Sequence, residues 1–335
     1  MSLQQKSNPE NDILLDIKGL KKYFPVNKSF SFFDQGNTYV KAVDDVDFQL
    51  RDGETFALVG ESGCGKSTTG RTLLRLINPT HGKALYNGID IFKLNGKELK
   101  AIRKDFQMVF QDPYSSLNPR KRIGQILEEP LIIHNIGTKK ERTEKVLEIM
   151  EKVGLQPEQY YRYPHEFSGG QRQRIGLARA LVVDPKVIIC DEPVSALDVS
   201  IQSQVINLLK QLQRELKLTY LFISHDLSVV RHISDRIAVM YLGKVMEEAE
   251  TEKIFEKPLH PYTQALLSSI PTPDPKEKRE KIILKGEIPS PLNPPSGCVF
   301  HPRCPHALDI CKLEVPKVHV TGDGHKVSCH LFSEI

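Results

Sequence analysis

A glycine-rich run of nine residues constrains the fold of this chain more than any other feature. The run is Gly60-Glu-Ser-Gly-Cys-Gly65-Lys66-Ser67-Thr68; it follows a strand-like segment, Thr55–Val59, and opens a helical pattern, Lys66–Leu76. Its spacing fits G-x-x-x-x-G-K-[ST]. Glycines let the backbone pass close to a ligand, and the N–H groups at a helix start favour negative charge. The run therefore predicts a phosphate cradle between a strand and a helix.

Polar groups of this cradle have predicted tasks. Lys66 is expected to reach the β- and γ-phosphates of a nucleotide, and Ser67 to place its hydroxyl on Mg²⁺. The loop backbone makes the remaining contacts, through Gly60, Ser62, Gly63, Cys64, Gly65 and Thr68. We interpret Cys64 as a small residue tolerated in the loop rather than a redox group, because thiol reactivity depends on pKa and exposure.

Strand-like runs alternate with helical patterns along most of the chain. The expected strands are Leu14–Ile17, Asp45–Leu50, Thr55–Val59, Lys83–Tyr86, Phe106–Phe110, Val187–Cys190, Tyr220–Ser224 and Arg236–Tyr241. The expected helices are Lys66–Leu76, Lys140–Val153, Gly169–Val182, Ser200–Leu216 and Leu227–Ile233. This alternation predicts an α/β fold with a mostly parallel sheet. Residues 113–166 lack a strand pattern and are expected to form an inserted helical subdomain.

Two further motifs carry chemistry. The apolar run Val187–Cys190 ends in Asp191 and Glu192. Beside a phosphate cradle, Asp191 is expected to hold Mg²⁺ and Glu192 to act as general base on the attacking water. The second motif, Ser168–Gln171, opens a helix with a suitable N-cap and two glycines, which predicts a second anion site. Two anion sites in one chain would be unusual if the chain bound only one nucleotide.

Together these motifs resemble the ABC-type ATPases. This resemblance implies a P-loop NTPase fold over residues 13–270, with a RecA-like core, a β-rich edge and the helical subdomain. In that family, two chains enclose two ATP molecules, and the signature of one chain contacts the γ-phosphate held by the other. The signature here is Ser168, Gly169, Gly170 and Gln171. The resemblance also assigns Gln111 as the nucleotide-sensing glutamine near Mg²⁺, Asp198 in the interface loop, His225 as the switch histidine on the γ-phosphate, and Tyr23 as the aromatic on adenine.

Over nearly its whole length the chain looks like ATPase subunits of bacterial dipeptide, oligopeptide and nickel importers. The resemblance rests on Phe110–Arg120, Asp191–Gln202, His260–Thr263 and Gly286–Cys304. It implies ATP hydrolysis that powers peptide import at the cytoplasmic face of the membrane, with the chain as a peripheral subunit. The implied partners are a second, distinct ATPase, two transmembrane permease subunits and, indirectly, an extracytoplasmic peptide-binding protein. The opening Leu20–Val26, with an insertion at Ser29–Thr38, favours the second ATPase type of the pair.

Other functions remain open at this point. The chain could serve import of nickel or another solute, or be an ABC ATPase outside transport, or a regulatory module without turnover. The absence of sustained heptads and the single set of motifs disfavour the second, and the intact Glu192 and His225 disfavour the third. A net charge of only +4 gives no basis for nucleic-acid binding. No apolar run approaches the roughly 18 residues of a membrane span, and the polar first twelve residues predict no signal peptide.

The end of the chain, residues 271–335, is predicted to be a proline-rich linker followed by a small Cys-rich domain. Prolines at 271–297 disfavour regular structure. Cys298, Cys304, Cys311 and Cys329 follow C-x5-C-x6-C-x17-C. Four thiolates suit Zn²⁺ or an iron–sulfur cluster, and the lack of tight C-x2-4-C pairs disfavours zinc. The family resemblance implies a [4Fe–4S] cluster; zinc or another metal, and free or paired thiols, remain alternatives. His301, His306, His325 and His330 are possible stand-in ligands, although we interpret each as a surface residue.

Overall fold

The computed structural model describes residues 13–26, 38–112, 114, 116–270 and 281–332. These form two compact units, each built from separate stretches of chain. The described residues of one unit fall within Met1–Leu15, Leu50–Thr55 and Tyr86–Ser224; those of the other fall within Asp16–Gln49, Phe56–Leu85 and His225–Ile335. Residues 29–37 of the predicted insertion and 271–280 of the predicted linker lie outside the described residues.

Three parallel strands organise the first unit, in the order β8-β7-β6. They are β6 (Phe106–Val109), β7 (Val187–Asp191) and β8 (Thr219–Ser224). Val187 of β7 pairs with Phe106 on one side and Thr219 on the other. Every residue of β7 and β8 is buried, as expected for continuous apolar runs in a sheet covered on both faces. The carboxyl ends of these strands therefore share one edge.

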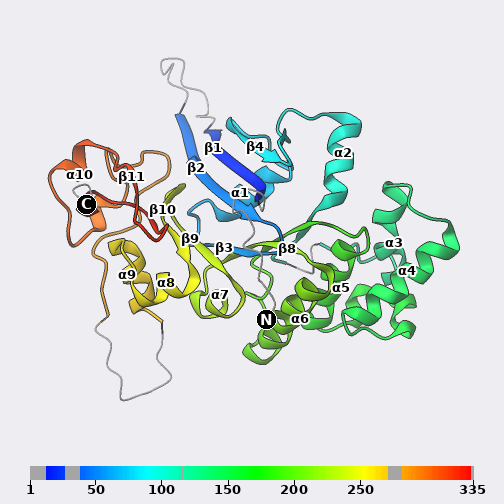
Figure 1. Cartoon of the computed structure of the whole chain (residues 1–335). Coiled ribbons are helices and arrows are strands. Elements are labelled where there is room, and N and C mark those ends of the chain that lie inside the picture. The colour runs from blue at the N-terminus through cyan, green and yellow to red at the C-terminus, as the bar shows by residue number, and fades with distance from the viewer. Residues whose placement is uncertain (1–12, 27–37, 113, 115, 271–280, 333–335) are drawn as a thin grey trace, which may run out of the picture. The chain divides into compact units, whose positions relative to one another are not determined.

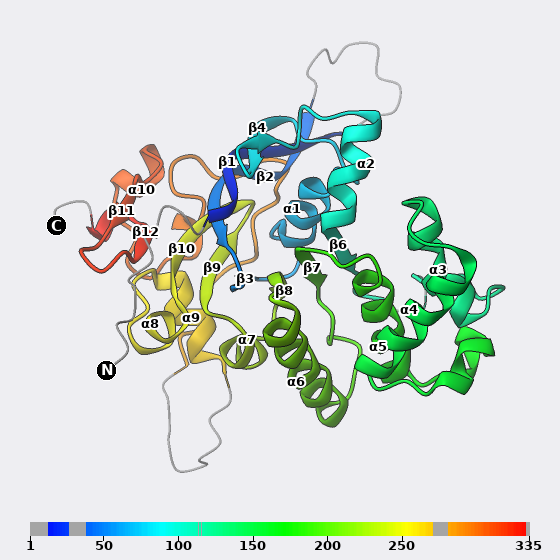
Figure 2. The ribbon, with the colours of Figure 1, turned by 45° about the vertical axis from the view of Figure 1, so that its right-hand side comes forward.

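Helices make up most of the rest of this unit. Its other elements are β5 (Ile89–Asp90), α2 (Gly96–Asp105), α3 (Ile123–Ile133), α4 (Lys139–Lys152), α5 (Gly169–Leu181), α6 (Val199–Leu216) and two 3₁₀ turns, Pro157–Tyr161 and Pro164–Glu166. Helices α3, α4 and α5 pack against one another (Figure 2). Thr138 caps α4 in a reciprocal capping box with Glu141. The described part of 113–166 contains helices and no strand, which confirms its predicted helical character.

The second unit contains the segment expected to bind phosphate. Its strands follow the order β11-β12-β10-β9-β3. They are β3 (Thr55–Val59), β9 (Arg236–Tyr241), β10 (Lys244–Glu250), β11 (Val318–Val320) and β12 (Lys326–Ser328). Strand β3 is parallel to β9, whereas β10 is antiparallel to both β9 and β12. The hairpin near the C-terminus thus extends the sheet that carries the phosphate loop (Figure 1).

A second sheet and several short helices complete this unit. Within this unit the sheet has the strand order β2-β1-β4, formed by β1 (Ile13–Val26), β2 (Thr38–Arg51) and β4 (His81–Tyr86). The helices are α1 (Lys66–Leu73), α7 (Leu227–Ile233), α8 (Thr251–Glu256), α9 (Pro261–Ser268) and α10 (Ile310–Leu313), with 3₁₀ turns at His301–Arg303 and His330–Phe332. Phe48 stacks on Phe56 with ring centroids 5.1 Å apart, which ties β2 to β3.

All eight predicted strands and all five predicted helices occur, several with different ends. Helix α1 stops at Leu73, three residues early, and Arg75 adopts a positive φ of 51° just beyond it. The sequence interpretation missed β5, β10, β11, β12, α2, α8, α9 and α10, and it gave no separate range for α3, which lies within the residues expected to be helical. Residues 281–297 contain no helix or strand, as their prolines predicted. The domain boundaries at 13–270 and 271–335, and a separate Cys-rich domain, stay predictions.

Candidate nucleotide site

The phosphate loop follows the fully buried strand β3 and leads directly into α1. Gly60 and Gly65 have φ of 149° and 105°, backbone angles that residues other than glycine rarely adopt. A Cβ at Gly60 would lie 2.1 Å from the carbonyl oxygen of Met240, and one at Gly65 would lie 2.1 Å from that of Ala42. Both glycines are therefore required because backbone from other strands passes against the loop.

Lys66 is the charged group of this loop, and its side chain is turned into it. Its Nζ donates to the carbonyl oxygens of Gly60 at 2.8 Å and Glu61 at 3.0 Å, and it lies 3.7 Å from the Cys64 sulfur. Lys66 is only 4% exposed. The carbonyl oxygens are neutral acceptors. Phosphate oxygens are charged and accept more strongly, so a bound phosphate would displace them as partners of the Lys66 ammonium.

The Cys64 side chain lies inside the loop, where its thiol is shielded from solvent. It is buried, and burial raises the pKa of its thiol against the opposing effect of Lys66. A raised pKa lowers the thiolate fraction, which is the reactive form. This supports the interpretation of Cys64 as a small residue whose backbone matters.

In the other unit, the structure brings together two of the predicted catalytic residues. Gln111 follows β6, and its amide Nε2 donates to the Glu192 carboxylate at 2.7 Å. Glu192 follows β7 and has a φ of 47°, which is uncommon for a residue with a side chain. Its backbone N–H donates to the carbonyl oxygen of Ile223 at 2.9 Å, which holds this conformation. Backbone strain of this kind is concentrated at functional sites. Asp191, the last residue of β7, is fully buried.

The predicted signature forms the N-terminus of α5. Ser168 is exposed; its hydroxyl accepts from the Gln171 N–H at 3.3 Å, and the Gln171 side chain accepts from the Ser168 N–H at 3.0 Å. A Cβ at Gly170 would lie 2.6 Å from the Ile201 side chain of α6, so α6 packs close to the turn. The arrangement fixes an exposed helix N-terminus, a geometry suited to anions.

The structure shows local contacts or exposure for three further predicted site residues: Asp198, His225 and Tyr23. Asp198 caps α6 by accepting from the Ile201 N–H at 3.0 Å, and this bond lowers the pKa of its exposed carboxyl. His225 comes directly after β8 and is exposed. The Tyr23 hydroxyl donates to Asp44, and burial together with this bond raises the pKa of Tyr23. Their roles toward nucleotide stay predictions.

Comparison with known proteins identifies the family. The family model for ABC transporters matches residues 43–195, and the one for the oligopeptide/dipeptide transporter C-terminal region matches residues 246–311. The oligopeptide transport ATP-binding protein AppF of Bacillus subtilis is 58% identical over 325 residues, covering 96% of this chain and 98% of the relative. The chain belongs to the ABC transporter ATP-binding family. The predicted family, its P-loop fold and its ATPase class are thereby confirmed.

Other relatives agree with this membership. The dipeptide transport ATP-binding protein DppF of Haemophilus influenzae is 56% identical over 321 residues, covering 96% of this chain and 97% of the relative. A dimeric structure of a post-hydrolysis state of the ATP-binding cassette MJ0796, bound to ADP and Pi, matches with a TM-score of 0.62 at 30% identity, over 71% of this chain and 98% of that one. Among the described residues of this ABC subunit, no helix combines the length and apolar character needed to cross a membrane.

The four tail cysteines of this ABC subunit lie near one another, without forming a recognisable metal site. Cys298 donates its backbone N–H to the carbonyl oxygen of Cys311 at 2.8 Å. Burial raises the pKa of Cys298, Cys304 and Cys329, the last to about 11, and neighbouring thiols raise each further. The donor set suits a thiolate-bound group. However, the described residues contain no group of three or more His, Cys, Asp or Glu placed to hold a metal ion, so the predicted [4Fe–4S] cluster is not supported.

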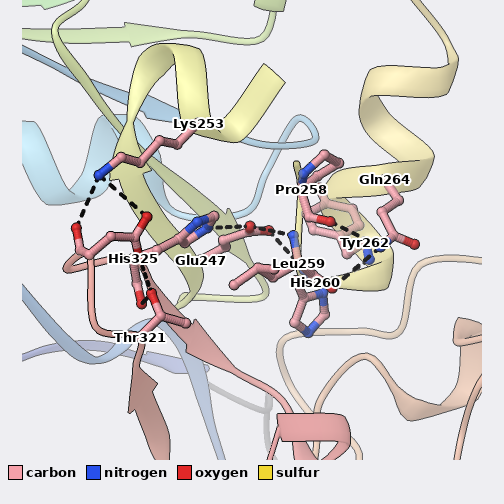
Figure 3. A network of polar contacts seen from close by, with 10 residues as sticks. Glu247, Lys253, Pro258, Leu259, His260, Tyr262, Gln264, Thr321 and His325 are labelled. Atoms are coloured by element: carbon pink, nitrogen blue, oxygen red, sulfur yellow. Dashed lines mark hydrogen bonds and ion pairs between the residues drawn. The ribbon is translucent and has the colours of Figure 1, made fainter. Parts of the chain in front are cut away.

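One of the tail histidines corrects the sequence interpretation. His325 is not a surface residue but 4% exposed, because its Nε2 lies 2.7 Å from the Glu247 carboxylate of β10. Glu247 also accepts from the backbone N–H groups of Leu259 at 2.7 Å and His260 at 3.0 Å (Figure 3). Burial lowers the pKa of His260 to about 4, so its ring is neutral near pH 7. This network joins the tail to the sheet of the phosphate loop.

The sequence interpretation missed a second connection between tail and loop. Glu61, inside the loop, forms an ion pair with Arg303 of the tail, and its backbone N–H donates to the Tyr262 hydroxyl at 3.0 Å. The only local signal was a carboxylate within a loop expected to bind anions. Nothing in the sequence pairs that carboxylate with an arginine 242 positions later.

Proposed function

We propose that this chain binds and hydrolyses MgATP to power import of oligopeptides or dipeptides, as one of two ATPase subunits of a membrane transporter. The hydrogen bond between Gln111 and Glu192 carries the catalytic part, because it joins the two residues expected at the reacting water on adjacent strand ends. The names of the full-length relatives and the matched oligopeptide/dipeptide C-terminal region support the transported class. Nickel or another small solute is the alternative cargo.

In this proposal, the chain's residues divide the work on one nucleotide. Lys66 and the loop N–H groups would receive the β- and γ-phosphates. The hydroxyl of Ser67 and the carboxylate of Asp191 would hold Mg²⁺, which would offset charge on the phosphate oxygens. Glu192 accepts a proton from the attacking water, and Gln111 orients Glu192. His225 contacts the γ-phosphate. Tyr23 stacks on adenine.

The remaining site residues act on the nucleotide of a partner chain. Ser168, Gly169, Gly170 and Gln171 would contact the γ-phosphate held by the second ATPase, and Asp198 would lie at the interface of the pair. The N-terminus of α5 supports this, since Ser168 is exposed and the start of a helix favours a bound anion. We propose a homologous but distinct partner, two permease subunits, a binding protein that delivers peptide, and a peripheral location at the cytoplasmic face of the membrane.

The substitution Glu192→Gln tests the catalytic assignment. It keeps size and hydrogen bonding but removes the base, so we expect MgATP binding within about threefold of wild type and a fall in turnover of at least about 10²-fold, in the range typical of a general base. Reconstituted transporter, assayed for phosphate release and ATP-dependent peptide uptake, provides the measurement. Full turnover by the variant would contradict the role given to Glu192. Uptake of nickel but not peptide by the wild-type transporter would show that nickel, the alternative, is the transported substrate.

The tail belongs to the proposal as a separate part. The family resemblance supports a [4Fe–4S] cluster on Cys298, Cys304, Cys311 and Cys329, with Zn²⁺ as the alternative. Iron and acid-labile sulfide, measured in full-length protein purified without oxygen, decide between them. If zinc is bound and iron is absent, the site is a zinc site rather than a cluster. If neither metal is found, the four cysteines are thiols.

A further inference from the structure

A carboxylate occupies an unexpected place inside the phosphate loop. Glu61 is the second residue of the nine-residue run, whose ligand carries several negative charges. An unpaired carboxylate there would repel phosphate, because like charges at short range disfavour each other in a partly desolvated site. The chain must either hold Glu61 away from the ligand or neutralise it.

Arg303 of the tail provides the neutralising charge. Its Nη1 lies 2.8 Å from Oε2 of Glu61 and its Nη2 lies 3.2 Å from Oε1, which is a two-point guanidinium–carboxylate pair. The side chains are 9% and 23% exposed for Arg303 and Glu61, so water screens the pair poorly. Burial lowers the pKa of Arg303, but the bonds to Glu61 and to the Tyr241 hydroxyl outweigh it and raise the pKa overall, which keeps the guanidinium charged.

Packing on both sides fixes the position of Arg303. Phe300, three residues before Arg303, is fully buried. Its ring centroid lies 5.3 Å from the ring centroids of Tyr241 and Tyr262. The guanidinium carbon of Arg303 lies over the Tyr241 ring, 5.8 Å from the ring centroid. Tyr262 in turn accepts the backbone N–H of Glu61. One aromatic cluster therefore holds both partners of the ion pair.

We propose that Arg303 is a positioning residue for nucleotide binding, which acts through Glu61 by cancelling its charge. The C-terminal region then takes part in the phosphate site through this ion pair. This inference rests on the proposed nucleotide role of Gly60–Ser67. It makes a specific demand: loss of Arg303 weakens binding only while Glu61 remains a carboxylate.

A double-mutant cycle measured by calorimetric titration of the full chain with MgADP tests this demand. Arg303→Ala is expected to raise Kd about tenfold, equivalent to about 1.4 kcal/mol. Arg303→Lys, which keeps the charge, and Glu61→Gln are each expected to stay within about threefold of wild type. The double variant Glu61→Gln/Arg303→Ala is expected to return to within about threefold, because the repulsive charge is gone. Raising the salt concentration should reduce the defect of Arg303→Ala.

Controls separate this role from a structural one. Lys312→Ala removes an exposed ion pair with Asp309 elsewhere in the tail and is expected to leave Kd unchanged. Where Arg303→Ala gives no cooperative thermal unfolding, Arg303→Gln replaces it in the same cycle, because it keeps most of the side-chain stem. The proposal is overturned if the Arg303→Ala or Arg303→Gln variant binds MgADP with the wild-type Kd. It is also overturned if the double variant with Glu61→Gln has a Kd as high as that single variant. Wild-type protein that fails to bind MgADP would instead overturn the proposed function itself.

Discussion

Glu247→Gln is expected to loosen the tail from the sheet that carries the phosphate loop. The Glu247 side chain is fully buried, and its two oxygens serve three partners: the N–H groups of Leu259 and His260 and the His325 ring (Figure 3). Glutamine offers one acceptor oxygen and an NH₂ group, which cannot accept from a backbone N–H. At least one charge-assisted bond is lost, at about 1.5–3 kcal/mol, and one buried donor is left unsatisfied, at about 1–3 kcal/mol.

The combined cost of about 2.5–6 kcal/mol predicts faster local opening. Because about 1.4 kcal/mol corresponds to tenfold, amide hydrogen exchange in β12 and at the start of α9 should accelerate on the order of 10²–10⁴-fold. Mass spectrometry of the exchanged full chain measures this, with β7 as an internal reference. Glu250→Gln is the matched control, since Glu250 lies on the same strand with a side chain 63% exposed and pairs with Lys253 at 3.4 Å. Less than about threefold acceleration for Glu247→Gln, or equal effects of both variants, would refute the reasoning.

Three further outcomes are expected. Gly65→Ala should abolish MgADP binding, because a Cβ would lie 2.1 Å from a backbone carbonyl oxygen, whereas Gly176→Ala in α5, with open space around it, should bind normally; calorimetry compares them. Ser168→Ala removes the oxygen that accepts the Gln171 N–H and should cost about 1 kcal/mol of helix stability and reduce ATP-driven pairing, with Ser168→Thr close to wild type in light scattering. Cys64 should resist iodoacetamide at pH 8 in the folded chain and react in urea, because burial raises the pKa of its thiol; rapid labelling of folded protein would contradict this.

The strands that the sequence predicted well are those with uniform apolar character. Val187–Asp191 and Thr219–Ser224 are buried at every position, so their side chains alone indicate a covered sheet. Strand β10, Lys244–Glu250, was missed because it carries four charged residues and resembles an exposed segment. Glu248 is nevertheless 3% exposed, since it pairs with Arg236 and, at 3.1 Å, with Lys326. Those partners are 12 and 78 positions away, beyond any local pattern.

Candidate site residues divide in the same way. The phosphate loop, the carboxylates after Val187–Cys190 and the signature helix were predictable, because anion binding at a helix start needs a short contiguous set of glycines and donors. The contact between Gln111 and Glu192 needed the parallel pairing of β6 with β7, although both residues had been singled out. The four-cysteine tail shows the limit of spacing, since the expected metal geometry does not appear among the described residues.

By itself, the sequence determined the chemistry of the loop: glycines that admit phosphate, Lys66 to neutralise it, and a strand and helix on either side. Only the tertiary structure decided what surrounds that loop. Glu61 and Arg303 meet because antiparallel pairing of β10 with β12 and burial of Phe300 hold the tail against the loop's own unit. Short-range motifs follow from local backbone and charge requirements, whereas an ion pair spanning 242 residues forms only when the packed core has brought its partners together.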